Sequence, residues 1–217
     1  MSEPEASLPS AQEALSKRRG SEPEASLPSA QEALSKRRAS EPEASLPSAQ
    51  EASQEAPVRE RIVRWEDPHA SAAALRGLTG LEALRAIMAG TIPRPPISAL
   101  IGMEIIEVED GRVVFEAEPG EHLYNPIGMV HGGFACTLMD TVMGCSIQSR
   151  LPAGVAYTTT DLQVRLIRAI LVSTGRVRGE GKAVHVGRST AVAEGRLTDM
   201  QGKLLALGTT GCAILRP

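Results

Sequence analysis

The chain has 217 residues, a formal net charge of -3 and only 2% aromatic residues. Because a strongly basic face and rings for base stacking are both lacking, this composition speaks against nucleic-acid binding. No apolar run reaches eighteen residues and the N-terminus lacks the basic-then-apolar order of a secretory signal, so we expect a soluble, cytoplasmic protein with no membrane contact.

The first 57 residues are dominated by a tandem repeat. SEPEASLPSAQEALSKRR at Ser2 to Arg19 recurs at Ser21 to Arg38, and its beginning recurs at Ser40 to Ala52, which gives a period of nineteen residues. The copies are rich in Ser, Pro and Glu and hold few large apolar side chains. They cannot bury enough surface to offset the entropy of ordering, so residues 1–57 are predicted to be a disordered tail.

Residues 58–97 are predicted to form a helical leader and a connector. Thr79-Gly80-Leu81-Glu82 has the spacing of a capping box, and Leu81, Leu84 and Met88 fall on one face of the helix that follows. The proline-rich stretch from Ile92 to Ile97 is predicted to be extended, because three prolines cannot continue a helix.

Residues 98–217 are predicted to form the main domain. Apolar runs on both sides of Asp110-Gly111 indicate a hairpin, and the proline-free stretch from Gly132 to Ser149 has the length of a helix. Three or four further strands with tight turns follow. The pattern predicts an α+β fold in which an antiparallel sheet wraps around one long, nearly uncharged central helix.

The three cysteines, Cys136, Cys145 and Cys212, lack the close spacing of metal or redox sites. We interpret them as reduced, small apolar side chains, and we expect no metal ion or redox cofactor.

The motif His131-Gly132-Gly133 stands where the predicted central helix begins. Two glycines there either relieve crowding or let an anion or a developing oxyanion approach the first helix amides closely. Asn125, in the preceding Asn-Pro sequence, is either a turn former or a side-chain amide donor near the same helix end. His131 is either an acid or base or a structural, neutral imidazole.

Asp140 is the only charged residue between Gly132 and Ser149. Its helical neighbours are small or apolar, so no polar stripe accounts for it. A carboxylate in a confined pocket can act as a general base on water or as a nucleophile.

Gly132 and Asp140 are eight residues apart, which corresponds to about 12 Å along one helix. Reacting atoms must approach to roughly 3 to 3.5 Å, so one chain cannot easily supply both groups to one substrate. We therefore expect a two-fold dimer, with two sites at the interface and the two helices running in opposite directions.

The pattern Asn125-x-x-Gly128-x-x-His131-Gly132-Gly133-x-x-x-x-Leu138-x-Asp140 resembles the signature of the PaaI-type hotdog-fold acyl-CoA thioesterases. The resemblance extends over Ser98 to Leu215. It implies a hotdog fold in dimers whose sheets join edge to edge. It also implies that Asn125 and the Gly132 amide polarise the thioester carbonyl, while Asp140 of the partner chain activates water or attacks.

The same resemblance implies further site residues. Thr159 falls where some members of the family orient the water with Ser or Thr, and it is predicted to share a strand face with Asp161. The turn from His185 to Ser189 matches the turn near the CoA nucleotide, so Gly187 and Arg188, with Gly133, are expected to bind CoA. The segment Arg168-Ala169 and the following ILVST depart from the family, which usually has Arg-Pro and a polar linker there.

These features together predict hydrolysis of a small aromatic or medium-chain acyl-CoA by a homodimer or a homotetramer built as a dimer of dimers. CoA would be part of the substrate, and no cofactor would be needed. A non-catalytic acyl-CoA-binding hotdog protein is one alternative. A hotdog hydratase or dehydratase is another, although those enzymes place a catalytic His with Asp or Glu differently.

Overall fold

Asp110 and Gly111 form the turn between the first two strands of the computed structural model, which describes residues 57–216. Strands β1 (Met103–Glu109) and β2 (Arg112–Ala117) pair in antiparallel register, with Glu109 opposite Arg112. Gly111 has a φ of 78°, a conformation that favours glycine. The predicted hairpin is therefore present, and its turn chemistry explains where it bends.

Four further strands complete one antiparallel sheet: β3 (Ala156–Leu166), β4 (Val177–Val186), β5 (Thr190–Asp199) and β6 (Leu204–Leu215). Their order across the sheet is β1-β2-β4-β5-β6-β3, so β1 and β3 are its two edges. A short 3-10 turn, η2 (Glu121–Leu123), lies in the connection from β2 to the long helix, and a second, η3 (Val172–Thr174), lies between β3 and β4. The predicted α+β class is confirmed.

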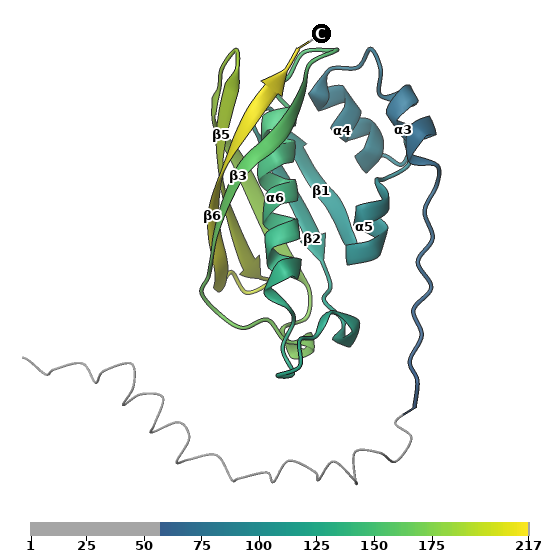
Figure 1. Cartoon of the computed structure of the whole chain (residues 1–217), viewed down its shortest axis with the longest axis vertical. Helices are drawn as coiled ribbons and strands as arrows, with labels where there is room; N and C mark the ends of the chain where they lie inside the picture. Colours follow the sequence, from purple (N-terminus) through teal and green to yellow (C-terminus); the bar gives the residue numbers. More distant parts are fainter. Residues whose placement is uncertain (1–56, 217) are drawn as a thin grey trace, which may run out of the picture. The chain divides into compact units, whose positions relative to one another are not determined.

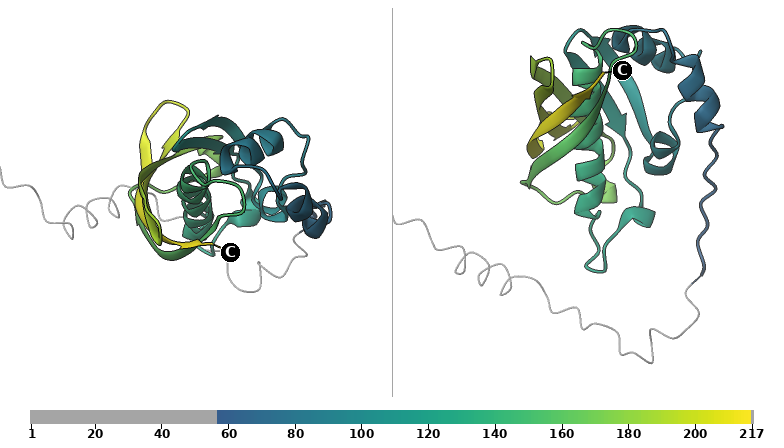
Figure 2. Two further views of the ribbon diagram at one scale, coloured as in Figure 1. Left: turned by 90° about the horizontal axis from the view of Figure 1, so that it is seen from above. Right: turned by 45° about the horizontal axis from the view of Figure 1, so that its top comes forward.

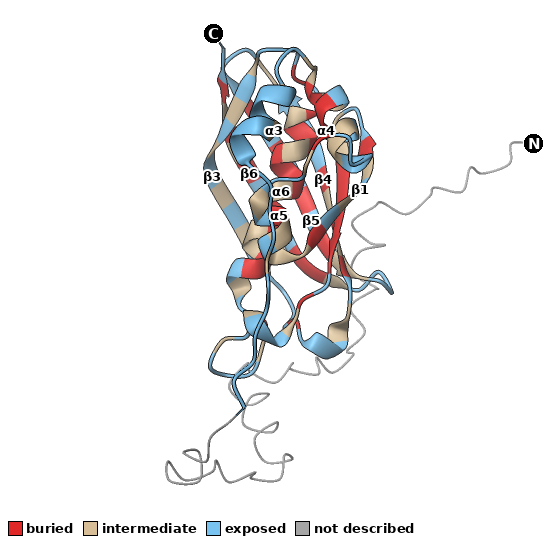
Figure 3. Cartoon of the chain, turned by 90° about the vertical axis from the view of Figure 1, so that its right-hand side faces the viewer, coloured by how far each residue is buried: buried red, intermediate tan, exposed pale blue. Residues whose placement is uncertain are grey.

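Helix α6 (Gly132–Gln148) is the predicted central helix, and its bounds agree with the sequence to within one residue. The sheet curves around it (Figure 1), and Figure 2 shows the same arrangement from above. About half of its residues are buried (Figure 3), and five of its large apolar side chains have no solvent-exposed surface, namely Leu138, Met139, Val142, Met143 and Ile147. Each such side chain contributes roughly 1.5–3 kcal/mol through burial, so this helix organises the core.

Glycines in the sheet bring the strands close to the α6 backbone. A Cβ added to Gly181 of β4 would lie 2.0 Å from the carbonyl oxygen of Val142, and one added to Gly195 of β5 would lie 2.8 Å from Met143 Cγ. The spaced glycines in this part of the sequence are therefore required by packing, because a larger side chain would push the helix off the sheet.

The leader contains α3 (Pro68–Ala74), α4 (Gly80–Met88) and α5 (Pro96–Ile101), which lie on the side of α6 away from β5 and β6 (Figure 1). The predicted capping box at Thr79 is present. The prediction of an extended chain through Ile97 is wrong at its end, because Pro96 begins α5. Proline is favoured at the first helical position, where its missing N–H has no helical partner to lose.

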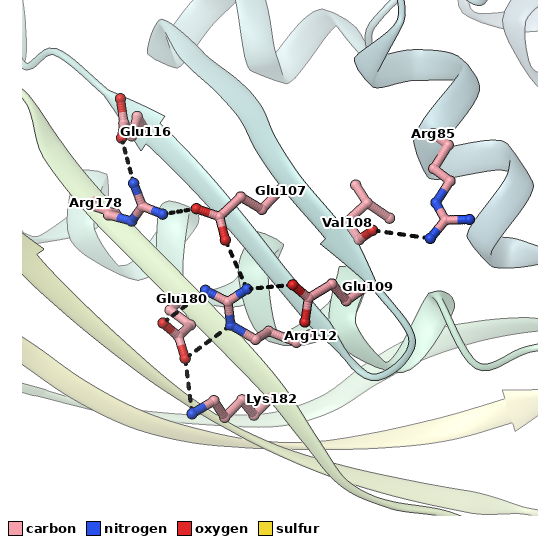
Figure 4. Close-up of polar contacts among 9 residues, drawn as sticks. All are labelled: Arg85, Glu107, Val108, Glu109, Arg112, Glu116, Arg178, Glu180 and Lys182. Atoms are coloured by element: carbon pink, nitrogen blue, oxygen red, sulfur yellow. Dashed lines mark hydrogen bonds and ion pairs between the residues drawn. The ribbon is translucent and has the colours of Figure 1, made fainter.

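A network of ion pairs crosses the outer face of β1, β2 and β4 (Figure 4). Arg112 contacts Glu107 at 2.8 Å and Glu180 at 3.4 Å, and Arg178 contacts both Glu107 and Glu116. The Arg112 hydrogen bond holds the pKa of Glu107 below its ordinary value. The outer face of this part of the sheet is thus polar, while its inner face packs on α6.

The predicted disordered tail, residues 1–57, lies outside the described residues except for Pro57. Within residues 57–216, no helix has both the length and the apolar composition needed to cross a bilayer.

Candidate active site

Asn125 shapes the loop that leads into α6. Its Oδ1 accepts hydrogen bonds from the backbone amides of Ile127 at 3.1 Å and Met129 at 3.2 Å, so the turn expected from Asn-Pro is present. With Oδ1 fixed as the acceptor, the Nδ2 group forms no hydrogen bond among the described residues. The two roles considered for Asn125 are therefore compatible with each other: its side-chain oxygen builds the turn, and its Nδ2 group is left as a donor.

His131 is the N-cap of α6. Its Nδ1 accepts a 2.9 Å hydrogen bond from the Gly133 amide, which assigns the imidazole a structural task and removes the Gly133 amide as a donor for a ligand. The Gly132 amide has no hydrogen-bond partner in the described part of the chain. As the first amide of the helix it carries partial positive charge, so it is the backbone donor available to an incoming oxygen.

Leu166, the last residue of β3, covers Gly132. A Cβ added to Gly132 would lie 2.7 Å from Leu166 Cδ1, so the glycine makes room for this side chain. The segment after β3 is fixed in place by two hydrogen bonds, from the Val130 amide to the Ile170 carbonyl at 3.0 Å and from the Val172 amide to Tyr124 Oη at 3.0 Å. The ILVST segment is thus tied to the loop before α6, and Leu166 places an apolar side chain at Gly132.

Asp140 lies in the middle of α6 and is half-buried. Thr159 of β3 donates a 2.9 Å hydrogen bond from Oγ1 to Asp140 Oδ1. The structure therefore brings together two predicted site residues that are 19 positions apart in the sequence and lie on different elements. A hydroxyl donor to one carboxylate oxygen fixes its orientation and leaves the other oxygen available.

The prediction that Thr159 and Asp161 share a strand face is wrong. The register of β3 against β6 shifts between them, so Thr159 lies opposite the buried Cys212 while Asp161 lies opposite Gly211 on the outer face. A bulge inserts one extra residue and reverses the alternation. Thr159 consequently points toward α6, and Asp161 points away from it.

Tyr157 is a neighbour of the site that the sequence did not single out. A Cβ on Gly144 of α6 would lie 2.3 Å from Tyr157 Oη, so the ring packs directly against the helix. Burial raises the pKa of Tyr157 well above its ordinary value, with Cys145, Cys212 and Asp140 adding to the effect. Its position two residues before Thr159, on the same strand face, is the sequence signal that could have identified it.

The candidate groups do not all meet within one chain. Gly132 and Asp140 lie eight residues apart on a continuous helix, or about 12 Å at 1.5 Å per residue. Arg188 lies farther away. The next residue, Ser189, accepts a hydrogen bond from the Ile214 amide, and Ile214 pairs with Tyr157 at the start of β3. Gly132, in contrast, contacts Leu166 at the end of β3. Gly187 and Arg188 are therefore at the opposite end of α6 from Gly132.

Arg188 is exposed, and its guanidinium forms no ion pair with any residue that the structure describes. Its backbone carbonyl accepts a 3.1 Å hydrogen bond from Arg216 Nε, which ties the β4–β5 turn to the chain end. Across residues 57–216, no three His, Cys, Asp or Glu side chains gather in a way that could hold a metal ion.

Comparisons with known proteins place this geometry in a family. A sequence model of the thioesterase superfamily matches residues 127–206. A candidate esterase of Halobacterium salinarum is 31% identical over 124 residues, which cover 54% of this chain and 80% of that protein. The chain belongs to the thioesterase superfamily.

One further relative and one solved structure are similar to this superfamily member. A 1,4-dihydroxy-2-naphthoyl-CoA hydrolase of Listeria monocytogenes is 29% identical over 52% of this chain and 91% of that protein. The solved structure of the Escherichia coli PaaI protein, from the phenylacetic acid degradation operon, is similar in fold: it is 19% identical, with a TM-score of 0.55 over 63% of this chain and 94% of that chain. The predicted PaaI-type hotdog fold is confirmed.

The superfamily match covers most of the candidate site. Residues 127–206 include Gly132, Asp140, Thr159 and Arg188, whereas Asn125 and the leader lie before the matched region.

Proposed function

We propose that this member of the thioesterase superfamily hydrolyses the thioester bond of an acyl-CoA. The observation that carries the proposal is the half-buried Asp140 carboxylate of the central helix, to which Thr159 donates a 2.9 Å hydrogen bond. The Nδ2 group of Asn125 and the Gly132 amide supply two donors at the end of the same helix. These groups match a reaction in which an oxyanion develops next to an attacking oxygen.

In the proposed reaction, the carbonyl oxygen of the thioester accepts hydrogen bonds from Gly132 and Asn125. Asp140 takes a proton from water, whose oxygen then bonds to the carbonyl carbon, or the carboxylate attacks that carbon itself. The carbon–sulfur bond breaks, the sulfur leaves as the CoA thiol after protonation, and a free carboxylic acid remains. Thr159 positions the carboxylate during these steps.

The donors and the carboxylate would come from two subunits. Within one chain Gly132 and Asp140 are about 12 Å apart along α6, which is too far for both to act on a single carbonyl carbon. Two observations leave room for a partner. β3 is an edge strand, and its inward-facing residue Thr159 is only half-buried, whereas Ala191 of β5, which pairs with the same residue of β6, is buried.

In this homodimer, Asp140 of the partner subunit faces Gly132 and Asn125 of the first subunit. The antiparallel helices would also bring the Arg188 turn of the partner subunit toward the Gly132 end. There its free guanidinium could bind a phosphate of CoA. A dimer of dimers is compatible with the same site.

The test is an acyl-CoA panel with detection of the free thiol, including small aromatic and medium-chain substrates. Asp140→Asn keeps the shape of the side chain but removes the base, so turnover should fall by about 10²–10⁴-fold while CoA binding persists. Asp161→Asn, on the outer face of the same strand that carries Thr159, should leave turnover unchanged. Unchanged turnover in Asp140→Asn would exclude the proposed mechanism, and CoA binding without any turnover in the wild type would favour the non-catalytic alternative.

A further inference from the structure

A cavity of about 450 Å³ lies between the leader and the hotdog sheet. We call it the leader pocket. Helix α4 and the connector after it form one wall, and β1 and α6 form the other. The side chains that define it are Leu84, Met88, Ile92, Ile97, Met103 and Cys145. Its volume is in the range of small-molecule binding pockets.

The interior of the leader pocket is apolar, and its charged residues are Glu66, Arg94 and Glu104. Arg94 and Glu104 pair with each other at 3.3 Å and are more than half exposed, so they belong to the rim. Burial, and then the charge of Asp140, raise the pKa of the Cys145 thiol to about 12. The α6 wall is therefore uncharged at neutral pH.

The lining of the pocket begins one residue after the proposed catalytic carboxylate of the same chain. Thr141, the residue after Asp140, lines the pocket, and its hydroxyl is already paired with the Thr137 carbonyl at 2.8 Å. Cys145 lies one turn farther along α6, close enough to Asp140 for its thiol to respond to the carboxylate charge. A substrate whose carbonyl lies at Asp140 can thus extend along α6 into the leader pocket.

The wall contributed by α4 is anchored to the domain. The Gly80 amide donates a 3.0 Å hydrogen bond to the Leu151 carbonyl, and a Cβ on Gly80 would lie only 1.7 Å from the Gln148 carbonyl oxygen. The beginning of α4 therefore packs backbone to backbone against the end of α6. This contact makes the pocket preformed, so a ligand need not order the leader when it binds.

We propose that the leader pocket receives the acyl chain of the thioester substrate and that this chain is an unbranched, medium-length aliphatic one. The proposal rests on the acyl-CoA thioesterase function proposed above. Leu, Ile and Met side chains dominate the lining, and Phe115 is its one aromatic residue. Flexible aliphatic walls fit a flexible chain, whereas a planar aromatic acyl group would gain more from aromatic neighbours.

Two variants test the pocket without opening the core. Ile97 of α5 and Met88 of α4 line it but are 42% and 41% exposed, so Ile97→Glu and Met88→Glu place a carboxylate in its wall with little risk to folding. Leu100→Glu is the matched control, because Leu100 lies on the same helix as Ile97, is 51% exposed and does not line the pocket.

The measurement is kcat/KM for octanoyl-CoA, acetyl-CoA and benzoyl-CoA. In the wild type, octanoyl-CoA should be the best of the three. Ile97→Glu and Met88→Glu should each lower the octanoyl-to-acetyl ratio by about tenfold or more, because methylenes in an apolar pocket contribute strongly to specificity. Leu100→Glu should keep the wild-type ratio. An unchanged ratio in both pocket variants, or a preference for benzoyl-CoA, would overturn the proposal.

A binding measurement separates failure of the pocket from failure of the catalytic proposal. Calorimetry with the non-hydrolysable thioethers S-octyl-CoA and S-ethyl-CoA does not require turnover. Tighter binding of S-octyl-CoA by at least about tenfold, lost in Ile97→Glu, supports the pocket even if no thioester is hydrolysed. Equal binding of the two thioethers, or binding of neither, overturns it even in an active enzyme.

Discussion

Thr159 on the edge strand β3 donates a hydrogen bond to Asp140 on the central helix at 2.9 Å. The bulge that follows Thr159 makes this contact possible, since it lets Thr159 face the helix while Asp161 faces outward. The hydrogen bond therefore joins the strand expected at the subunit interface to the carboxylate expected to act in catalysis.

If Thr159 positions the carboxylate, its hydroxyl matters more than its size. Thr159→Val, which keeps the shape, should lower kcat by roughly ten- to a hundredfold with little change in KM, and Thr159→Ser should restore most of the loss. Thr160→Val is the control, because the Thr160 hydroxyl donates to the Gly211 carbonyl on the other side of the strand. Equal activity of the Val and Ser variants at position 159 would contradict a positioning role.

The shared site predicts complementation between two inactive chains. Asn125→Asp keeps the oxygen that builds the turn but removes the Nδ2 donor, and Asp140→Asn removes the base. In a mixed dimer both defects fall in one site and the other site is intact. Random mixing makes half of the dimers mixed, so activity should recover to about a quarter of the wild-type value.

The measurement is thiol release after the two chains are denatured and refolded together, with the mixed dimer confirmed by mass spectrometry. Each variant mixed with itself provides the background. Verified mixed dimers that remain as inactive as their parents would rule out a site built from two subunits.

Much of the fold follows from local sequence signals. Asp110-Gly111 predicts the hairpin, Thr79 with Glu82 predicts the start of α4, and the glycines at positions 132 and 133 mark the start of α6. Each signal acts within a few residues through capping or turn geometry, so one sequence suffices to find it.

Other features depend on pairing between distant segments, and the sequence alone does not reveal them. The bulge between Thr159 and Asp161 depends on how β3 aligns with β6, and simple alternation predicts the wrong face for Asp161. The contact of Gly80 with the Gln148 carbonyl, on which the leader pocket depends, joins two helices whose packing no local pattern specifies. The residues of a partner subunit and the preferred acyl group likewise depend on contacts between segments that are distant in the sequence.

Close packing of β4 on α6 predicts a large difference between two neighbouring glycines. Gly181→Ala would bring a Cβ to 2.0 Å from the Val142 carbonyl oxygen, and backbone cannot move aside easily. It should lower the free energy of unfolding by about 1–3 kcal/mol. The matched control is Gly179→Ala, whose new Cβ meets side-chain atoms of Val142 and Leu138 at 3.1 and 3.3 Å.

Urea unfolding monitored by circular dichroism measures both changes. Since side chains can shift by a few tenths of an ångström, Gly179→Ala should stay within about 1 kcal/mol of the wild type. Equal destabilisation by the two substitutions would show that the clash with the α6 backbone does not determine the cost of Gly181→Ala.

The ion pairs on the outer face predict a pH-dependent contribution of Arg112 (Figure 4). The hydrogen bond from Arg112 is the main reason why the pKa of Glu107 is below its ordinary value of 4.5. A carboxyl group with a lowered pKa in the folded state stabilises the protein above its unfolded pKa, and this stability is lost as the pH falls through the lowered value. Arg112→Gln should therefore lower Tm at pH 7, and the gap to the wild type should shrink below about pH 4.5.

Arg94→Gln is the matched control for this experiment. Its partner Glu104 and Arg94 itself are 57% and 55% exposed, so that ion pair is expected to contribute little at any pH. Thermal unfolding of the three proteins at several pH values between 3 and 7 gives the comparison. If the gap between wild type and Arg112→Gln stays constant over that range, the effect of Arg112 comes from packing of its aliphatic stem and not from the charge of Glu107.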